Sequence, residues 1–228
     1  TIIYLLSSCI LYSPRPKLWL IVSVIVAIGN LAVFKYFNFF APEMMNQFAK
    51  IGIDISLPVA EIILPIGISF YTFHSMSYLV SIYRKEIQPV SFFDFALFLS
   101  FFPSVIAGPI NRAKDFMPQI QATAPREVQE WHRAFMLLLL AVIKVYWLSA
   151  FFSETWVRPV FDNPSKFHTV ELILGAYAYA VEIYLNFSGY TDLVTGIALL
   201  LGFKLPVNFR APYLATSLKR FWSMWHIS

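Results

Sequence analysis

The chain has 228 residues, of which 58% are hydrophobic and only 13% are charged, and its formal net charge is +4. Soluble globular domains are about 45–50% apolar and about 25% charged. The composition therefore excludes an ordinary soluble domain, and it also excludes a disordered chain, which needs low hydrophobicity and high charge. At about 20 residues per membrane span, the length allows roughly five to seven membrane segments. The basic residues are scattered, so we expect no nucleic-acid partner, and the single cysteine, Cys9, excludes an internal disulfide.

The apolar stretches, taken in chain order, predict an all-α polytopic membrane protein. We expect the longest of them to cross the membrane and the shorter ones to enter and leave on the same side. The polar stretch at residues 41–57 predicts a loop with a surface-lying helix. The simplest organisation is one membrane domain covering residues 1–228. The predicted spans are residues 18–34, 61–83, 134–152 and 170–185, and the predicted re-entrant segments are residues 91–106 and 189–205.

The distribution of Lys and Arg sets the expected orientation. In this arrangement twelve basic residues lie on the cytoplasmic side and four lie outside, as the positive-inside rule requires. Re-entrant backbone is tolerated at membrane depth only where protein buries it or where it lines a wet cavity. The topology therefore predicts a helical core with re-entrant segments around a funnel. Since the sequence starts inside an apolar run at Thr1 and stops in a motif-like stretch at Ser228, we expect the protein to continue beyond both ends.

His226 is the side chain best suited to acid–base chemistry. Histidine changes charge near neutral pH, and a partly desolvated imidazole beside a substrate hydroxyl can act as a general base. The alternative is an interfacial histidine held among the tryptophans of residues 220–228. The four histidines lack the spacing of metal ligands, so we expect no metal site. Among them, His74 lies in a predicted span, where we expect a structural hydrogen bond.

Two polar breaks interrupt the apolar pattern. In residues 186–192, Gly189 permits a tight turn, and Ser188, Tyr190 and Asp192 could cap a helix or line a polar cavity; a plain turn is the alternative. In the second break, after the Gly108–Pro109 pair, Arg112 could hold a carboxylate or a phosphate, or serve as a positive-inside anchor. For the intramembrane Lys144 and Glu182, function and structural pairing both stay open.

A series of short motifs follows the chain from end to end. They are residues 34–37 (FKYF), 64–73 (LPIGISFYTF), 77–78 (SY), 82–84 (IYR), 101–103 (FFP), 107–112 (AGPINR), 187–192 (FSGYTD), 201–203 (LGF), 208–209 (NF), 211–214 (APYL), 221–222 (FW) and 225–228 (WHIS). This series resembles the membrane-bound O-acyltransferase (MBOAT) family, and most closely its alginate O-acetyltransferase branch. The match extends over nearly the whole chain, and the motifs occur in the family's order.

The resemblance implies a multi-helix core around a funnel and transfer of an acyl group, expected to be acetyl, from a thioester to a hydroxyl. The co-substrate would be acetyl-CoA or an acyl carrier protein on the cytoplasmic side, with no bound cofactor. The partners would be a periplasmic or extracellular acyltransferase and the exported polysaccharide, and the location would be the bacterial inner membrane. His226 would be catalytic. The candidates for substrate binding or funnel lining are Arg112, Ser188, Tyr190, Asp192, Asn208, Trp222 and Trp225.

The chain departs from the family pattern at several positions. The family has a second histidine, in a Trp-His-Gly context, that would fall beyond Ser228, so we expect the sequence as given to be inactive by itself. Ser223 and Met224 stand where the family usually has two arginines, and Asn186 stands where it commonly has Asp.

Two other functions stay open. One is transfer of a different acyl group, such as D-alanine, to an envelope polymer. The other is a transporter or channel-like protein without chemistry, which an inverted repeat of broken helices would favour.

Overall fold

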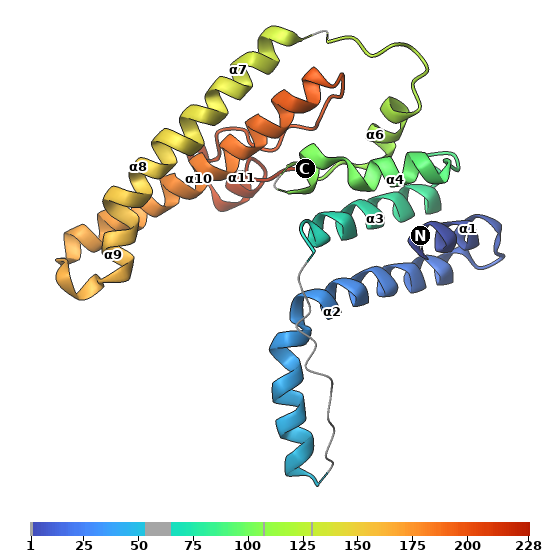
Figure 1. The fold of residues 1–228 in the computed structure, drawn as a ribbon, viewed down its shortest axis with the longest axis horizontal. Helices are drawn as coiled ribbons and strands as arrows, with labels where there is room; N and C mark the ends of the chain where they lie inside the picture. Colours follow the sequence, from blue (N-terminus) through green and yellow to red (C-terminus); the bar gives the residue numbers. More distant parts are fainter. Residues whose placement is uncertain (1, 53–64, 107, 129) are drawn as a thin grey trace. The chain divides into compact units, whose positions relative to one another are not determined.

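The computed structural model describes residues 2–52, 65–106, 108–128 and 130–228 (Figure 1). Within these ranges the chain is helical, and its β structure is limited to one isolated antiparallel bridge between Phe209 and Trp225. The prediction of an all-α protein is therefore confirmed. By their contacts the residues form two compact units, one of residues 1–101 and 112–121 and the other of residues 102–111 and 122–228. The single-domain expectation stays a prediction.

The described residues of the first unit form five helices around an aromatic core. Ser91 starts one of them by accepting a hydrogen bond from the backbone N–H of Asp94 at 3.1 Å, which is a standard N-terminal cap. His74 is fully buried beside the ring of Phe98, so its surroundings are those of a core residue. The helices are α1 (Ile2–Tyr12), α2 (Pro16–Lys50), α3 (Ile68–Tyr83), α4 (Phe92–Ser100) and α6 (Ala113–Ile120), and the largest buried side chains include Tyr78, Phe95, Phe98, Phe116 and Met117.

Helix α2 contains the predicted span 18–34 and extends into residues 41–57, where a loop with a surface-lying helix was predicted. Residues 41–50 are indeed helical, but no loop separates them from the span. The helix continues through Pro42 to Lys50 and stops at a turn that includes Gly52; residues 53–57 lie outside the described ranges. A proline inside a helix removes one hydrogen bond and crowds the carbonyl four residues earlier, which bends the helix without ending it. Figure 1 shows this long helix bent partway along its length.

Two other predicted segments fall in shorter helices. Of the predicted span 61–83, residues 61–64 lie outside the described ranges and the rest contains α3, which begins after Gly67 in a left-handed conformation. The predicted re-entrant segment 91–106 forms α4 and the four-residue α5 (Phe102–Val105). At about 1.5 Å per residue, none of the helices α3, α4 and α5 is long enough by itself to cross a hydrocarbon core about 30 Å thick.

The second unit is built on two long helical rods that lie side by side (Figure 1). The first rod runs from Trp131 to Asp162 and contains the predicted span 134–152. Two of its stretches are π-helical, and the second ends at Val157, two residues before Pro159, whose ring would crowd a regular α-turn. The rod consists of α7 (Trp131–Val142), η1 (Ile143–Ser149), α8 (Ala150–Phe152), η2 (Ser153–Val157) and α9 (Arg158–Asp162); η3 (Pro164–Lys166), α10 (Thr169–Leu200), η4 (Pro212–Leu214) and α11 (Leu218–Trp222) follow.

Helix α10 corrects the prediction at residues 186–205. It is continuous from Thr169 to Leu200, so residues 186–192 form neither a turn nor a helix start, and residues 189–205 do not form a separate re-entrant segment. The reason is packing: a Cβ on Gly189 would come within 2.6 Å of Val145 Cγ2 and 2.9 Å of Lys144 Cβ. This glycine lets the two rods approach closely, which outweighs its low helix propensity.

The start of the first rod lies close to the end of α10. Glu130 at the start of α7 forms ion pairs with Lys204 at 2.8 Å and with Arg133 at 2.8 Å. The hydrogen bond from Lys204 and the neighbouring Arg133 lower the pKa of the Glu130 carboxyl. These contacts place Arg133 and Lys204 at the same end of the hairpin, as the predicted topology requires. Which end faces the cytoplasm stays a prediction.

In the part of the chain that the structure describes, three helical rods are long and apolar enough to cross a membrane: Pro16–Lys50, Trp131–Asp162 and Thr169–Leu200. Only 11% of the most apolar stretch of each is buried in the protein. Apolar side chains displayed outward in this way are stable in hydrocarbon and costly in water.

Candidate functional site

The candidate site forms where the chain turns back after α10. The helix ends with Gly202 at a φ of 78°, while Phe203 N donates to Ala198 O and Gly202 N donates to Leu199 O. This Schellman motif satisfies the last carbonyls of the helix and reverses the chain. The following segment then runs back along α10, and Tyr213 Oη donates to Ala180 O at 2.6 Å.

Asn208 and His226 meet on this returning segment. Asn208 Oδ1 lies 2.7 Å from His226 Nδ1, and Ile227 N donates to Asn208 O at 3.1 Å. The bridge between Phe209 and Trp225 extends the pairing. His226 has a φ of 45°, a left-handed conformation that is rare for a residue other than glycine. The chain thus holds the histidine through its backbone and its ring at once.

Aromatic side chains enclose one side of the histidine. The ring of Phe187 on α10 lies 5.1 Å from the imidazole, between ring centres. Trp225 packs against Phe209 at 5.2 Å and against Phe221 at 5.5 Å. His226 itself is half-buried, and this burial lowers the pKa of its imidazole. The ring is therefore neutral at physiological pH, the form that can accept a proton.

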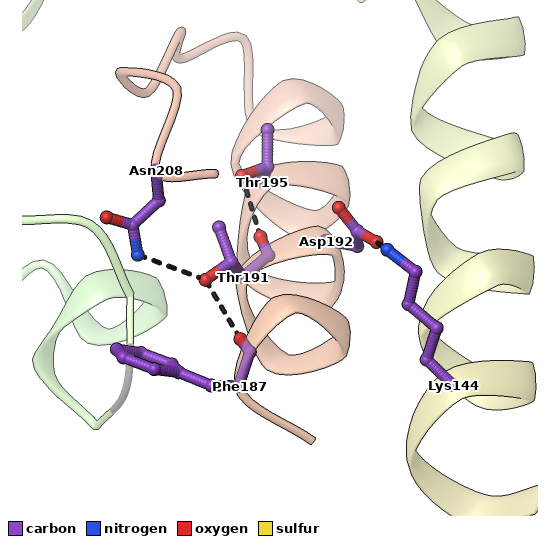
Figure 2. Close-up of polar contacts among 6 residues, drawn as sticks. All are labelled: Lys144, Phe187, Thr191, Asp192, Thr195 and Asn208. Atoms are coloured by element: carbon purple, nitrogen blue, oxygen red, sulfur yellow. Dashed lines mark hydrogen bonds and ion pairs between the residues drawn. The ribbon is translucent and has the colours of Figure 1, made fainter. Parts of the chain in front are cut away.

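A chain of hydrogen bonds surrounds Asn208, which is 1% exposed. Ile110 N donates to Ser228 Oγ at 3.0 Å, and Ser228 Oγ donates to Asn208 Oδ1 at 3.0 Å. Asn208 Nδ2 donates to Thr191 Oγ1 at 3.2 Å, and Thr191 Oγ1 donates to Phe187 O at 3.1 Å. Figure 2 shows Asn208 and Thr191 together on one side of α10. Both ends of the amide are thus satisfied.

Asp192 lies on the other side of α10, where its carboxylate forms an ion pair with Lys144 Nζ at 2.6 Å (Figure 2). Structural pairing, one of the two roles left open for Lys144, therefore holds, and its partner is Asp192. The half-buried Glu182 has no role assigned by these contacts.

The remaining candidates are spread over the chain. Ser188 is buried in α10, whereas Tyr190 on the same helix is exposed. Trp222 is 66% exposed at the end of α11. Arg112 is exposed just before α6 and belongs to the first unit. In the described ranges no three His, Cys, Asp or Glu side chains gather as metal ligands would.

Sequence reasoning missed Phe187 as a neighbour of His226, and Thr191 and Ser228 as hydrogen-bond partners of Asn208. All three lie in motifs that the sequence singled out, at residues 187–192 and 225–228. On a continuous helix, positions 187 and 191 share a face. These neighbours could have been predicted only if α10 had been predicted as one continuous helix through residues 186–192.

A chain of helices with three membrane-spanning rods, in the ranges that the structure describes, is a polytopic membrane protein. The model of the membrane-bound O-acyltransferase (MBOAT) family matches residues 20–228. The chain therefore belongs to this family.

Bacterial relatives support this assignment. The probable alginate O-acetylase AlgI of Pseudomonas aeruginosa is 36% identical over 214 residues, which are 92% of this chain and 40% of the relative. The peptidoglycan O-acetyltransferase of Helicobacter pylori is 30% identical, over 93% of this chain and 44% of the relative. The teichoic acid D-alanyltransferase of Bacillus subtilis is 28% identical, over 75% of this chain and 44% of the relative. The chain thus spans about two fifths of the length of these relatives.

Proposed function

We propose that the protein is a membrane O-acyltransferase that moves an acetyl group from a thioester to a hydroxyl, for modification of an exported polysaccharide. Membership of the family supports the reaction class. The relatives support the acceptor class, since their names describe acyl transfer to alginate, peptidoglycan or teichoic acid. The O-acetylase relatives share more sequence with this chain than the D-alanyltransferases do, which favours acetyl as the group transferred.

The single observation that carries the proposal is the half-buried, neutral His226 held at 2.7 Å by a buried amide. A general base must be unprotonated at the working pH and fixed in orientation. His226 meets both requirements. His226 is only half-buried, so part of the residue is open to the surroundings.

The reaction then follows from ordinary acid–base chemistry. The free ring nitrogen of His226 takes the proton of the acceptor hydroxyl as the hydroxyl oxygen bonds to the thioester carbonyl carbon. The C–S bond breaks, and the leaving thiolate takes the proton from the imidazolium to become a thiol. General-base assistance of this type contributes about 10²–10⁴-fold to the rate. No step needs an acyl–enzyme intermediate.

The donor is acetyl-CoA or an acetylated acyl carrier protein, used as a co-substrate on the cytoplasmic side of the bacterial inner membrane. The positive-inside orientation supports this placement, because the segment with Lys204, Arg210, Lys219, Arg220 and His226 follows the end of α10. A periplasmic or extracellular acyltransferase completes transfer to the polymer.

A second candidate is transfer of D-alanine from a carrier protein to an envelope polymer. The similarity to the teichoic acid D-alanyltransferase of Bacillus subtilis over 75% of this chain favours it. The same histidine chemistry serves both reactions, so the identity of the ester-linked group distinguishes them.

The test compares the complete protein with its His226→Ala variant at matched membrane levels. Groups released from the extracellular polymer by mild base are identified by mass spectrometry. We expect acetate from the wild type and at least a hundredfold less from the variant, within the range given by general-base catalysis of about 10²–10⁴-fold. Released D-alanine would select the second candidate. Unchanged acetate in the variant would remove His226 from the mechanism, and the absence of any ester in the wild type would favour a transport function.

A further inference from the structure

Asn208 sits where it can set the protonation of the His226 ring. A neutral imidazole carries its proton on only one nitrogen, and the partner of the other nitrogen decides which one. The amide group of Asn208 presents either an oxygen or an NH₂ to His226 Nδ1. The neighbouring hydrogen bonds determine which of the two it is.

Ser228 fixes the oxygen toward the histidine. Its Oγ accepts a hydrogen bond from Ile110 N at 3.0 Å, so its own proton is available for donation. The atom that it reaches at 3.0 Å is Asn208 Oδ1. The same oxygen therefore accepts from Ser228 and from His226 Nδ1 at 2.7 Å.

Thr191 fixes the other end of the amide. Its hydroxyl donates to Phe187 O at 3.1 Å within α10 and accepts from Asn208 Nδ2 at 3.2 Å. With the Thr191 proton committed to the helix backbone, the amide must point its NH₂ at this hydroxyl. Each hydrogen bond in the chain from Ile110 to Phe187 thus has one donor and one acceptor.

We propose that Asn208 is a positioning residue that holds His226 with its proton on Nδ1, so that the lone pair of Nε2 faces the acceptor hydroxyl. This inference rests on the proposed function for its catalytic meaning. Thr191 and Ser228 orient the amide and act on the histidine only through Asn208. The role differs from substrate contact, because the side chain of Asn208 is buried and its polar atoms bond within the protein.

The side-chain oxygen of Asn208 is the polar atom that contacts Nδ1 of His226. The ring of Phe187 packs against the imidazole from α10. The titratable Tyr184 and Tyr213 join the aromatic cluster through Trp225, and Arg210 is exposed beside Phe209. The ion pair of Lys144 and Asp192 lies on the other side of α10 (Figure 2). A charge introduced at residue 208 would therefore act on His226 directly.

Three substitutions in the complete protein separate positioning from folding. Asn208→Leu keeps the branched shape of the side chain, although leucine is larger, and removes the oxygen that accepts from Nδ1. Asn208→Asp keeps an accepting oxygen and adds a negative charge. Thr191→Val removes the hydroxyl that accepts from the amide. The matched control is Thr195→Val, one helical turn further on, whose hydroxyl donates to Thr191 O at 2.7 Å.

The kinetic readout is kcat, KM for the acyl donor and the pH profile, at matched membrane levels. We expect Asn208→Leu to lower kcat about 10- to 100-fold with little change in KM, which is part of the general-base contribution. Asn208→Asp should retain most of kcat and move the acid limb of the profile to higher pH, because a carboxylate stabilises the imidazolium. Thr191→Val should lower kcat several-fold, and Thr195→Val should leave it unchanged.

A spectroscopic readout tests the geometry without activity. Solid-state ¹⁵N NMR of histidine-labelled protein in lipid bilayers distinguishes the two neutral tautomers, and the His226→Gln variant assigns the signal. We expect His226 to be protonated on Nδ1 in the wild type and to become a mixture of tautomers in Asn208→Leu.

The outcomes separate this inference from the proposed function. A wild-type His226 protonated on Nε2 overturns the inference whatever the activity. So does an Asn208→Leu variant with wild-type kcat, or an equal loss in the Leu and Asp variants with no change in the pH profile. A wild type that forms no ester overturns the proposed function, while the tautomer measurement still decides the role of Asn208.

Discussion

The ion pair between Lys144 and Asp192 gives the sharpest prediction about stability. The two groups lie 2.6 Å apart, their side chains are 23% and 20% exposed, and both residues lie inside rods long enough to cross a membrane. At this distance the attraction is about 6 kcal/mol for an effective dielectric constant of about 20, before the cost of desolvating both charges. Removing one partner of a buried pair costs about 3–5 kcal/mol, because the other charge stays buried and unpaired.

Water reaches about a fifth of each side chain, so the lower part of this range applies. We expect Lys144→Met to reduce the free energy of unfolding by about 2–4 kcal/mol. The double variant Lys144→Met with Asp192→Leu should lie within about 1 kcal/mol of the wild type, because it buries no charge. Because Asp192→Leu alone should cost a similar amount, the double-mutant cycle should give a coupling energy of at least about 3 kcal/mol.

The assay is reversible unfolding of the complete protein in mixed micelles, with the wild type, both single variants and the double variant measured side by side. A coupling energy within about 0.5 kcal/mol of zero would refute the reasoning, since independent sites add within that margin. Acyl transfer by the double variant is informative as well. Retained activity would assign Asp192 to structure, whereas lost activity in a stable double variant would return it to the substrate-binding candidates.

Three further predictions concern packing, hydrogen bonding and pH. Gly189→Ala should lower the melting temperature, because the new Cβ lies 2.6 Å from Val145 Cγ2 and overpacking costs about 1–3 kcal/mol. Gly29→Ala is the control, because nothing lies within 4 Å of its Cβ. Equal melting temperatures of the two variants would contradict the packing argument. Tyr213→Phe should cost about 0.5–1.5 kcal/mol of unfolding free energy by removing the 2.6 Å hydrogen bond to Ala180 O; an unchanged value would mean that water replaces this bond. Since burial lowers the pKa of His226 below 6.5, its neutral form persists as pH falls, and the acid limb of kcat/KM should lie below pH 6.5; a limb above this pH would contradict the burial argument.

Much of the membrane architecture could be predicted from the sequence. A span needs about 20 apolar residues, a local property that composition along the chain reveals directly. For this reason the predicted spans 18–34, 134–152 and 170–185 all lie inside the observed rods. The family motifs are also local, and the match to residues 20–228 agrees with them.

The predicted helix boundaries were less accurate, and the errors have a common cause. The polar residues after Pro42 indicated a loop, and the cluster around Gly189 indicated a turn. In both places the helix continues. Proline and glycine weaken a helix locally, but close packing stabilises the helix at Gly189, and a proline inside a helix bends it without ending it.

The sequence by itself determined the membrane class, the apolar spans and His226 as the side chain best suited to general-base chemistry. The tertiary structure alone decided the hydrogen-bond partners at His226. Asn208 precedes His226 by 18 positions, and Thr191, which Asn208 contacts in turn, precedes it by 35; they come together only after the chain reverses at Gly202. It likewise paired Asp192 with Lys144, 48 positions earlier. Apolar length and motif composition are properties of neighbouring residues. The partner of a buried polar group depends instead on which distant segment of the chain packs against it in the fold. The residues next to that group in the sequence do not specify this segment.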